Sequence, residues 1–358
     1  MPDRILITGG AGFVGSTVGL ELRRRFPQAK VVALDNLRRR GSELNVPRLK
    51  AAGIDFVHGD VRQPSDLEAL SCDLLIECSA EPSAQAGYSD TPDYVIQTNL
   101  LGCYHCLNLA RRTKADFIFL STSRVYPTGI LNNLAYRETP SRFEWLDEQV
   151  VPGASRHGVS EELSTKGARS VYGMTKLAAE LMIEEFADAY SLRYVIDRCG
   201  LIAGPWQMGK VDQGVVTLWL AAHFFGRPLR YIGFGGQGKQ LRDILHVDDL
   251  AELAATQASC MNHFHGRTLN VGGGLNFSLS LREMTTECEE LTGMRIAIEP
   301  EMAERPADLR IYVTDSRKIE QHCQWKPSRG PDIVLRDIYR WVSDNRELVG
   351  PALFSPAL

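Results

Sequence analysis

The feature that most constrains this chain is a glycine-rich turn that follows a short apolar segment near the N-terminus. Residues 4–8 are typical of a buried strand and residues 12–26 of a helix. Glycines let the turn between them close tightly and approach a phosphate, which the free N–H groups at the start of a helix attract. The turn therefore predicts a dinucleotide-binding site, and it reads Thr8-Gly9-Gly10-Ala11-Gly12-Phe13-Val14-Gly15, with the spacing G-x-G-x-x-G.

Further apolar runs alternate with amphipathic stretches along the first half of the chain. They are typical of strands separated by helices, and they lie at residues 30–34, 55–58, 74–78, 117–120 and 193–197. This alternation predicts an α/β fold, namely a doubly wound parallel sheet (Rossmann) with a smaller mixed α/β C-terminal substrate domain. We expect the Rossmann domain over 1–200 with a return segment at about 240–275, and the substrate domain over 201–239 and 276–358.

Two other segments carry local structural signals. The polar stretch between Tyr126 and Tyr172 contains several prolines and glycines, and we expect a long functional loop there, either a lid or a pocket wall. The helix that carries Tyr172 should run to about residue 190. Ser280 and Glu283 have the spacing of a capping box at the start of another helix.

An acidic residue refines the expected ligand of the glycine turn. Asp35 ends the second predicted strand, about 20 residues after Gly15, where a carboxylate accepts a ribose hydroxyl and repels a 2′-phosphate. NAD is therefore favoured over NADP, although the basic run 38–40 could hold a phosphate. Asp60 follows the next strand and is expected to face the adenine, with a simple helix or turn cap as the alternative.

A tyrosine and a lysine supply a candidate proton-transfer site. Tyr172 and Lys176 lie four residues apart and so on one helix face. A free tyrosine has a pKa of about 10, so a neighbouring ammonium and the positive ring of an oxidised nicotinamide would favour its ionised form. The hydroxyls of Ser121, Thr122 and Ser123 follow the strand 117–120, at the strand end where such sheets bind ligands, although ordinary turn residues have the same appearance.

Composition excludes several other kinds of protein. The 358 residues are 44% hydrophobic with a net charge of −4, which does not indicate a nucleic-acid or membrane-surface partner. No apolar run has transmembrane length and the N-terminus reads as a strand, so a cytoplasmic location is the default expectation. Cys103 and Cys106 form a C-x-x-C pair without a second pair to complete a zinc site, and buried thiols are the expectation there.

Taken together, these motifs resemble the extended short-chain dehydrogenase/reductases of the nucleotide-sugar epimerase/dehydratase type over nearly the whole chain. The resemblance runs through the glycine turn, Asp35-Asn36, Gly59-Asp60, Asn99, residues 121–126, Tyr172–Lys176 and residues 238–250. It implies a triad of Thr122, Tyr172 and Lys176 and a tightly held NAD. The implied cofactor contacts are Gly9, Gly12, Phe13, Val14, Gly15, Asp35, Asn36, Asp60, Val61, Ala80, Asn99, Tyr172 and Lys176.

A narrower resemblance concerns the reaction. Sugar-nucleotide 4,6-dehydratases place Asp-Glu after the triad threonine to eliminate water, whereas this chain has Ser123-Arg124. The chain instead resembles CDP-tyvelose (CDP-paratose) 2-epimerases, which implies oxidation at C2 of the sugar by NAD and return of the hydride to the opposite face. The segments that carry this resemblance are 35–45, Trp206-Gln207-Met208, Asp212-Gln213-Gly214 and 238–243.

The same resemblance implies the partners of the site. A nucleotide-sugar substrate, with a CDP-sugar favoured, would contact Ser83, Thr122, Ser123, Gln207, Gln213, Arg242 and Arg310. Arginine holds a phosphate bidentately, so Arg242 and Arg310 are the implied diphosphate clamps, with exposed surface arginines as the alternative. A homodimer built on the helices that start near Pro92 and Tyr172 is also implied.

Several departures from the family pattern keep other functions open. Leu201 stands where many sugar epimerases have a substrate-binding asparagine, while Ser123 and Pro127 replace the asparagine and glycine of close 2-epimerases. The stretch 126–172 is also unlike their short loop. A UDP-sugar 4-epimerase is the alternative enzyme, and an NAD-binding sensor or scaffold without turnover is the alternative of another class.

Overall fold

The computed structural model describes residues 1–88, 91–209 and 213–354, and the chain packs into two compact units. The first unit comprises residues 1–125, 171–198 and 247–269, and the second comprises 126–170, 199–246 and 270–358. The domain bounds expected from the sequence stay a prediction. In the structure, residues 126–170 belong to the second compact unit, whereas the expected Rossmann domain runs over 1–200.

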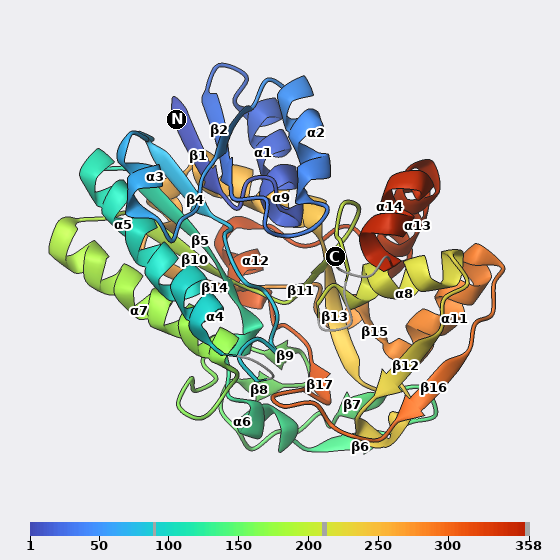
Figure 1. The fold of residues 1–358 in the computed structure, drawn as a ribbon. Helices are drawn as coiled ribbons and strands as arrows, with labels where there is room; N and C mark the ends of the chain where they lie inside the picture. Colours follow the sequence, from blue (N-terminus) through green and yellow to red (C-terminus); the bar gives the residue numbers. More distant parts are fainter. Residues whose placement is uncertain (89–90, 210–212, 355–358) are drawn as a thin grey trace. The chain divides into compact units, whose positions relative to one another are not determined.

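A sheet of seven strands forms the centre of the first unit, in the order β14-β10-β5-β4-β1-β2-β3 (Figure 1). Parallel pairing joins β1 to β2 and β4, β2 to β3, and β4 to β5. The order reverses beside β1, as in a doubly wound fold, so the predicted fold class is confirmed. The strands are β1 (Arg4–Thr8), β2 (Lys30–Asp35), β3 (Asp55–His58), β4 (Leu74–Glu77), β5 (Asp116–Thr122), β10 (Tyr194–Cys199) and β14 (Arg267–Val271).

Helices cover both faces of this sheet (Figure 1). Helices α1 and α9 pack against one another, while α5 packs on α7. Their bounds are α1 (Phe13–Arg25), α2 (Asn45–Ala51), α3 (Pro64–Glu68), α4 (Asp93–Ile96), α5 (Gly102–Thr113), α7 (Val171–Tyr190), α9 (Val247–Ser259) and α10 (Met261–Phe264).

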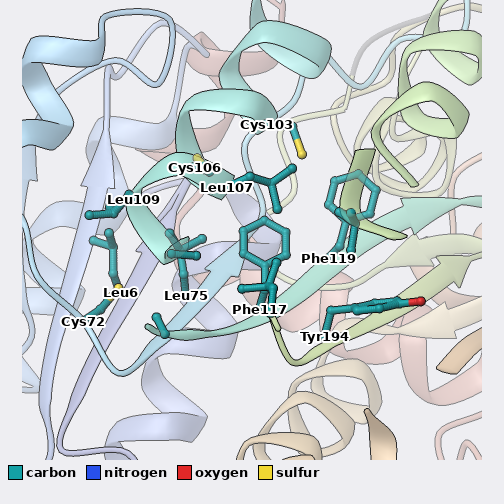
Figure 2. Packing of buried hydrophobic residues seen from close by; sticks show 14 of the residues in the cluster. Leu6, Cys72, Leu75, Cys103, Cys106, Leu107, Leu109, Phe117, Phe119 and Tyr194 are labelled. Atoms are coloured by element: carbon teal, nitrogen blue, oxygen red, sulfur yellow. The ribbon is translucent and has the colours of Figure 1, made fainter. Parts of the chain in front are cut away.

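Apolar side chains from strands and helices meet in a core on one face of the sheet (Figure 2). Phe117 and Phe119 project from β5 and lie with their rings nearly parallel, at a centroid distance of 6.5 Å. Cys103 and Cys106 of α5 are fully buried in the same cluster. This confirms the expectation that the C-x-x-C pair consists of buried thiols, which behave here as small apolar groups.

The second unit has smaller sheets. Strand β13 pairs in parallel with β11 and β17 and antiparallel with β15, while β12 pairs with β16. Helix α8 packs against α11 and α13. The bounds are β11 (Leu201–Ala203), α8 (Val215–Phe224), β12 (Leu229–Ile232), β13 (Leu241–His246), β15 (Ser278–Ser280), α11 (Leu281–Thr292), β16 (Ile298–Glu301), β17 (Ile311–Tyr312), α12 (Arg317–Cys323), α13 (Pro331–Asp344) and α14 (Arg346–Phe354).

The stretch 126–172, predicted as a long loop, has secondary structure of its own. It contains α6 (Thr128–Asn132), the hairpin of β6 (Tyr136–Glu138) and β7 (Phe143–Trp145), and the hairpin of β8 (Ala154–Ser155) and β9 (Gly158–Val159). Most of the stretch is irregular, as expected of a loop. The sequence did not predict its short strands, because two or three residues are too few to produce a readable periodicity.

Two local predictions are confirmed. The helix that carries Tyr172 is α7 and ends at residue 190. Ser280 caps α11, because its hydroxyl accepts the N–H of Glu283 at 3.0 Å and the Glu283 side chain accepts the N–H of Ser280 at 2.9 Å.

Candidate active site

The glycine turn lies between β1 and α1, and its glycines are required by close packing. A Cβ on Gly15 would lie 2.2 Å from the carbonyl oxygen of Gly9, so no side chain fits there. Gly9 adopts a φ of +63° and presses against the backbone of Cys78 at the end of β4. Gly12 caps α1 without a side chain, and the first turn of α1 holds no acidic residue. The N–H groups at this helix start therefore suit the diphosphate of a dinucleotide, as predicted for Phe13, Val14 and Gly15.

Asp35 ends β2 beside this turn. Its two carboxylate oxygens accept the N–H groups of Ala11, at 3.1 Å, and Leu37, at 2.8 Å. Burial raises the pKa of Asp35, and these backbone bonds oppose the rise. The bonds orient the carboxylate and leave it lone pairs to accept a ribose hydroxyl.

Asp60 is held in a separate polar network. Asn36 donates to it at 2.9 Å and Arg62 forms a bidentate contact. Burial alone would raise the pKa of Asp60, but the bonds from Arg62 and Asn36 lower it to about 2. The guanidinium groups of Arg62 and Arg38 also lie over the ring of Tyr94, at 4.9 and 4.0 Å from its centroid. The expectation that Asp60 faces adenine stays a prediction.

Asn99 joins the segment after β4 to helix α7. It lies, fully buried, in a π-helical turn at Gln97–Leu101. Its side chain accepts the N–H of Glu81 at 2.8 Å and donates to the Glu81 carbonyl at 3.1 Å and to Thr175 at 3.3 Å. This clamp holds the segment that contains Ala80 and Ser83, two other predicted contacts, against the helix that carries Tyr172. Val61, after β3, is buried.

Tyr172 and Lys176 lie one turn apart at the start of α7. Tyr172 is partly exposed, whereas Lys176 is 2% exposed and donates to the carbonyl oxygen of Leu120 at 3.0 Å. The ammonium also lies over the ring of Phe119, at 4.4 Å from its centroid, and 3.9 Å from the carboxylate of Glu77. Burial, the largest single effect, lowers the pKa of Lys176, but the interactions with Glu77, Tyr172 and the nearby thiols together outweigh it and raise this pKa above its ordinary value.

The three neighbouring hydroxyls at the end of β5 have different surroundings in the structure. Ser121 bonds to the carboxylate of Glu180, which also binds Arg198 at 2.6 Å. The side chain of Ser121 is therefore engaged inside the fold. Thr122 ends β5, where its hydroxyl accepts the N–H of Arg124 at 3.2 Å, and Ser123 begins a short 3-10 turn. Thr122 thus stays the predicted triad hydroxyl.

In the second unit, a pocket has a cationic wall. Arg242, Arg305 and Asp308 line it together with the apolar side chains of Leu201 and Val216. Asp308 binds both guanidinium groups at 3.3 Å, so two guanidinium groups lie on the same wall. The wall therefore suits a dianionic group such as a diphosphate.

Arg310 lies apart from this wall, among aromatic rings. Its guanidinium is 4.3 Å from the ring centroid of Tyr136, 5.2 Å from that of Phe234 and 5.8 Å from that of Phe143. It also donates to the Asn132 carbonyl at 3.0 Å. Its assignment as a diphosphate clamp stays a prediction.

The remaining predicted contacts of the second unit are the two glutamines. Gln207 is buried, donates to Ile202 at 3.0 Å and accepts from Thr217 at 2.9 Å. Gln213 is partly exposed, and Asp212, which precedes it in the motif, lies outside the described residues.

Sequence reasoning missed Glu77 and Arg305. Glu77 lies in an apolar run of the sequence. Its carboxylate alone could have indicated a buried ion pair, because an ionisable residue inside a buried strand needs a partner. Arg305 precedes Pro306, and nothing in the spacing reveals which of the nearby arginines faces the pocket. Among the residues that the structure describes, no cluster could hold a metal ion and no helix is long and apolar enough to cross a membrane.

The fold and the glycine turn define a dinucleotide-binding protein with a doubly wound sheet. Comparison with known proteins narrows this class, because residues 5–272 match the model of the NAD dependent epimerase/dehydratase family. The chain belongs to that family, and NAD is its cofactor. The glycine turn and Asp35 fit this cofactor.

Individual relatives divide among several reactions. The chain is 28% identical to the CDP-paratose 2-epimerase of Salmonella typhi, over 95% of this chain and 99% of the relative. It is also 28% identical to the UDP-glucose 4-epimerase of Erwinia amylovora, over 95% and 98%. The solved UDP-glucose 4-epimerase of Thermus thermophilus, in complex with NAD, is 25% identical with a TM-score of 0.74, over 95% and 99%.

Proposed function

We propose that this protein is an NAD-dependent nucleotide-sugar epimerase that acts at C2 of a CDP-linked deoxyhexose of the CDP-paratose/CDP-tyvelose type. The observation that carries the proposal is the side-chain set at the end of β5 and the start of α7. Thr122, Tyr172 and Lys176 can support proton transfer, while Ser123 and Arg124 offer no carboxylate of the kind that a dehydratase uses. The similarity to a CDP-paratose 2-epimerase over nearly the whole chain supports the choice of carbon and nucleotide.

Each residue of the set has a separate task in the proposed reaction. NAD, when bound, would supply the hydride acceptor and donor for the sugar carbon. Tyr172 takes the proton of the sugar hydroxyl as the carbonyl forms and gives it back after the hydride returns. Thr122 orients that hydroxyl, and the ammonium of Lys176 favours the ionised tyrosine. Because the hydride removed from the sugar would be returned to its opposite face, the reaction would need no external reductant.

The substrate's nucleotide end is assigned to the second unit. Arg242 with Arg305 would bind the diphosphate, because the two guanidinium groups line the same pocket. The other predicted substrate contacts, Ser83, Thr122, Ser123, Gln207, Gln213 and Arg310, remain part of this proposal.

Proton NMR of the sugar ring tests the proposal directly. The purified protein is incubated with CDP-paratose, and inversion at C2 changes the couplings of the C2 proton to its neighbours. The expected result is a new set of signals with the couplings of the C2 epimer, in the wild type but not in Tyr172→Phe. A spectrum of CDP-paratose that stays unchanged would contradict the assignment.

A second candidate is a UDP-sugar 4-epimerase, favoured by the similarity to the Erwinia amylovora enzyme. In the same experiment with UDP-glucose, this reaction would change the couplings of the C4 proton. If neither sugar were converted and Tyr172→Phe altered no measured activity, the third alternative of an NAD-binding sensor or scaffold would be favoured.

A further inference from the structure

A carboxylate lies in the middle of the parallel sheet, where charged residues are rare. Glu77 occupies the last position of β4 and pairs with Thr8 of β1 on one side and Phe119 of β5 on the other. Its side chain is fully buried. Among the residues that the structure describes, neither of its carboxylate oxygens has a hydrogen-bond partner. A buried carboxylate without hydrogen bonds is costly, so its position calls for an explanation.

The explanation lies 3.9 Å away, at the ammonium of Lys176. Lys176 is itself buried, and it also donates to one carbonyl oxygen and lies over the face of a phenyl ring. Neither group carries a charge. Among the described residues, Glu77 has the one carboxylate that lies within ion-pair distance of this ammonium.

The other ionisable groups around the pair cannot replace Glu77. Three thiols interact electrostatically with it, those of Cys78, which follows β4, and of Cys103 and Cys106 on α5. Burial raises the pKa of each thiol, so they stay neutral. The remaining neighbour of the ammonium is Tyr172, the proposed proton-transfer residue.

We propose that Glu77 is a positioning residue whose buried carboxylate holds Lys176 in the ammonium form at the proton-transfer site. Without a counter-charge, a lysine in an apolar surrounding loses its proton readily. A neutral Lys176 could no longer favour the ionised form of Tyr172. This inference depends on the proposed function for its catalytic consequence, whereas the charge of Lys176 can be measured without any substrate.

The pair also responds to pH. Burial raises the pKa of Glu77 to about 7, although the charge of Lys176 opposes the rise. Glu77 therefore takes up a proton as the pH falls through neutrality, and the ammonium then stays behind without its counter-charge. No bond other than this O–H forms or breaks in the step.

Titration of Lys176 by NMR tests the inference. The full chain, loaded with NAD, carries lysine labelled at Cε, whose resonance reports the charge of the amine, and Lys176→Met identifies the signal. In Glu77→Gln, we expect Lys176 to lose its proton at a pH at least about one unit lower than in the wild type. The matched control is Asp197→Asn, which changes a buried carboxylate of β10 bonded to Gln257 and should leave the Lys176 signal unchanged.

Identical Lys176 titrations in the wild type and in Glu77→Gln would overturn the inference. The wild type gives a test that does not depend on the variant's folding, because the Lys176 resonance should shift near pH 7 as Glu77 takes up its proton. A Lys176 resonance that did not shift near pH 7 would also overturn the inference. Failure to epimerise any sugar would contradict the proposed function and leave this titration unaffected, so the two outcomes are distinguishable.

Discussion

At the scale of single residues, the candidate site depends on side chains whose environment assigns them different tasks. Ser121, Thr122 and Ser123 are adjacent and chemically alike, yet Ser121 is engaged by Glu180 while Thr122 ends the strand. Likewise, Lys176 is buried among uncharged groups beside a carboxylate, whereas Tyr172, one turn earlier, is partly exposed. Partial exposure suits a residue that must meet a substrate, and burial suits one that acts through its charge.

The first prediction concerns the tyrosine hydroxyl. Tyr172→Phe removes the proposed acid–base group and leaves the ring, so turnover should fall by about 10²–10⁴-fold while NAD stays bound. Conversion of CDP-paratose is followed by NMR and bound NAD by absorbance after denaturation. Tyr190→Phe, at the exposed end of the same helix, is the control and should keep wild-type activity. Wild-type turnover in Tyr172→Phe would rule out this residue as the proton-transfer group.

The second prediction concerns cofactor choice. Asp35→Ala removes a carboxylate that can accept a ribose hydroxyl, and a hydrogen bond to a charged group is worth about 1.5–3 kcal/mol. Affinity for NAD should therefore fall by about 10–100-fold, while affinity for NADP should change less because a repulsive charge is also lost. Calorimetric titration with each cofactor measures both constants. Asp55→Ala, at the exposed edge of β3, is the control. An unchanged ratio of the two affinities would contradict the role given to Asp35.

At the scale of elements, residues 126–170 show how a segment without clear periodicity is ordered by its contacts. Arg142 pairs with Glu283 of α11 at 2.6 Å, and Glu138 pairs with Lys239 at 2.7 Å. Phe143 packs in a small core with Phe234 and Ile311. The β6–β7 hairpin therefore forms part of the second unit and supplies two of the aromatic rings around Arg310.

The third prediction tests the start of α11. Ser280→Ala removes the N-cap bond to Glu283 and a second bond that the Ser280 hydroxyl donates to the Ser141 carbonyl at 2.8 Å. The free energy of unfolding should fall by about 0.5–2 kcal/mol. Urea denaturation measures it, with Thr286→Ala on the exposed side of the same helix as the control. Equal losses in the two variants would mean that the cap contributes nothing specific.

At the scale of the whole molecule, buried acids make stability depend on pH. Burial raises the pKa of Asp197 from 3.8 to about 7, against the bond from Gln257. Between pH 3.8 and pH 7 the folded state binds more protons at Asp197 than the unfolded state does. The contribution of Asp197 to the free energy of unfolding is therefore greatest at low pH and is lost as the pH rises through 7.

The fourth prediction concerns the change of the free energy of unfolding with pH. Between pH 5 and 7, the free energy of unfolding should fall with a contribution from Asp197 of up to about 1.4 kcal/mol per pH unit. Denaturation at a series of pH values measures the slope, and Asp197→Asn should make it shallower. Asp93→Asn, an exposed acid at the start of α4, should leave the slope unchanged. A wild-type slope of zero or of opposite sign would contradict the prediction.

The fifth prediction concerns self-association, which we propose as a homodimer through the helices that start near Pro92 and Tyr172, namely the consecutive helices α4 to α5 and helix α7. Helices α5 and α7 pack together and leave large apolar side chains exposed, among them Tyr104 at 43%, Leu181 at 60% and Tyr190 at 53%. Leu181→Glu should convert the dimer into a monomer, because a buried unpaired charge is costly. Light scattering after size-exclusion chromatography gives the mass. Leu348→Glu, exposed on α14, is the control, and a monomeric wild type would contradict the proposal.

The sequence by itself determined the doubly wound sheet, the glycine turn and the helix that carries Tyr172 and Lys176. These features depend on local chemistry, because strand periodicity, missing side chains and helix spacing act over a few residues. Tertiary structure decided which side chains meet. It placed Glu77 of β4 beside Lys176 of α7 and engaged Ser121 with Glu180. It also put Arg305, and not Arg310, in the lining of the pocket that Arg242 lines. Such contacts join residues far apart in the chain, and their energies arise only when burial removes water from the charges.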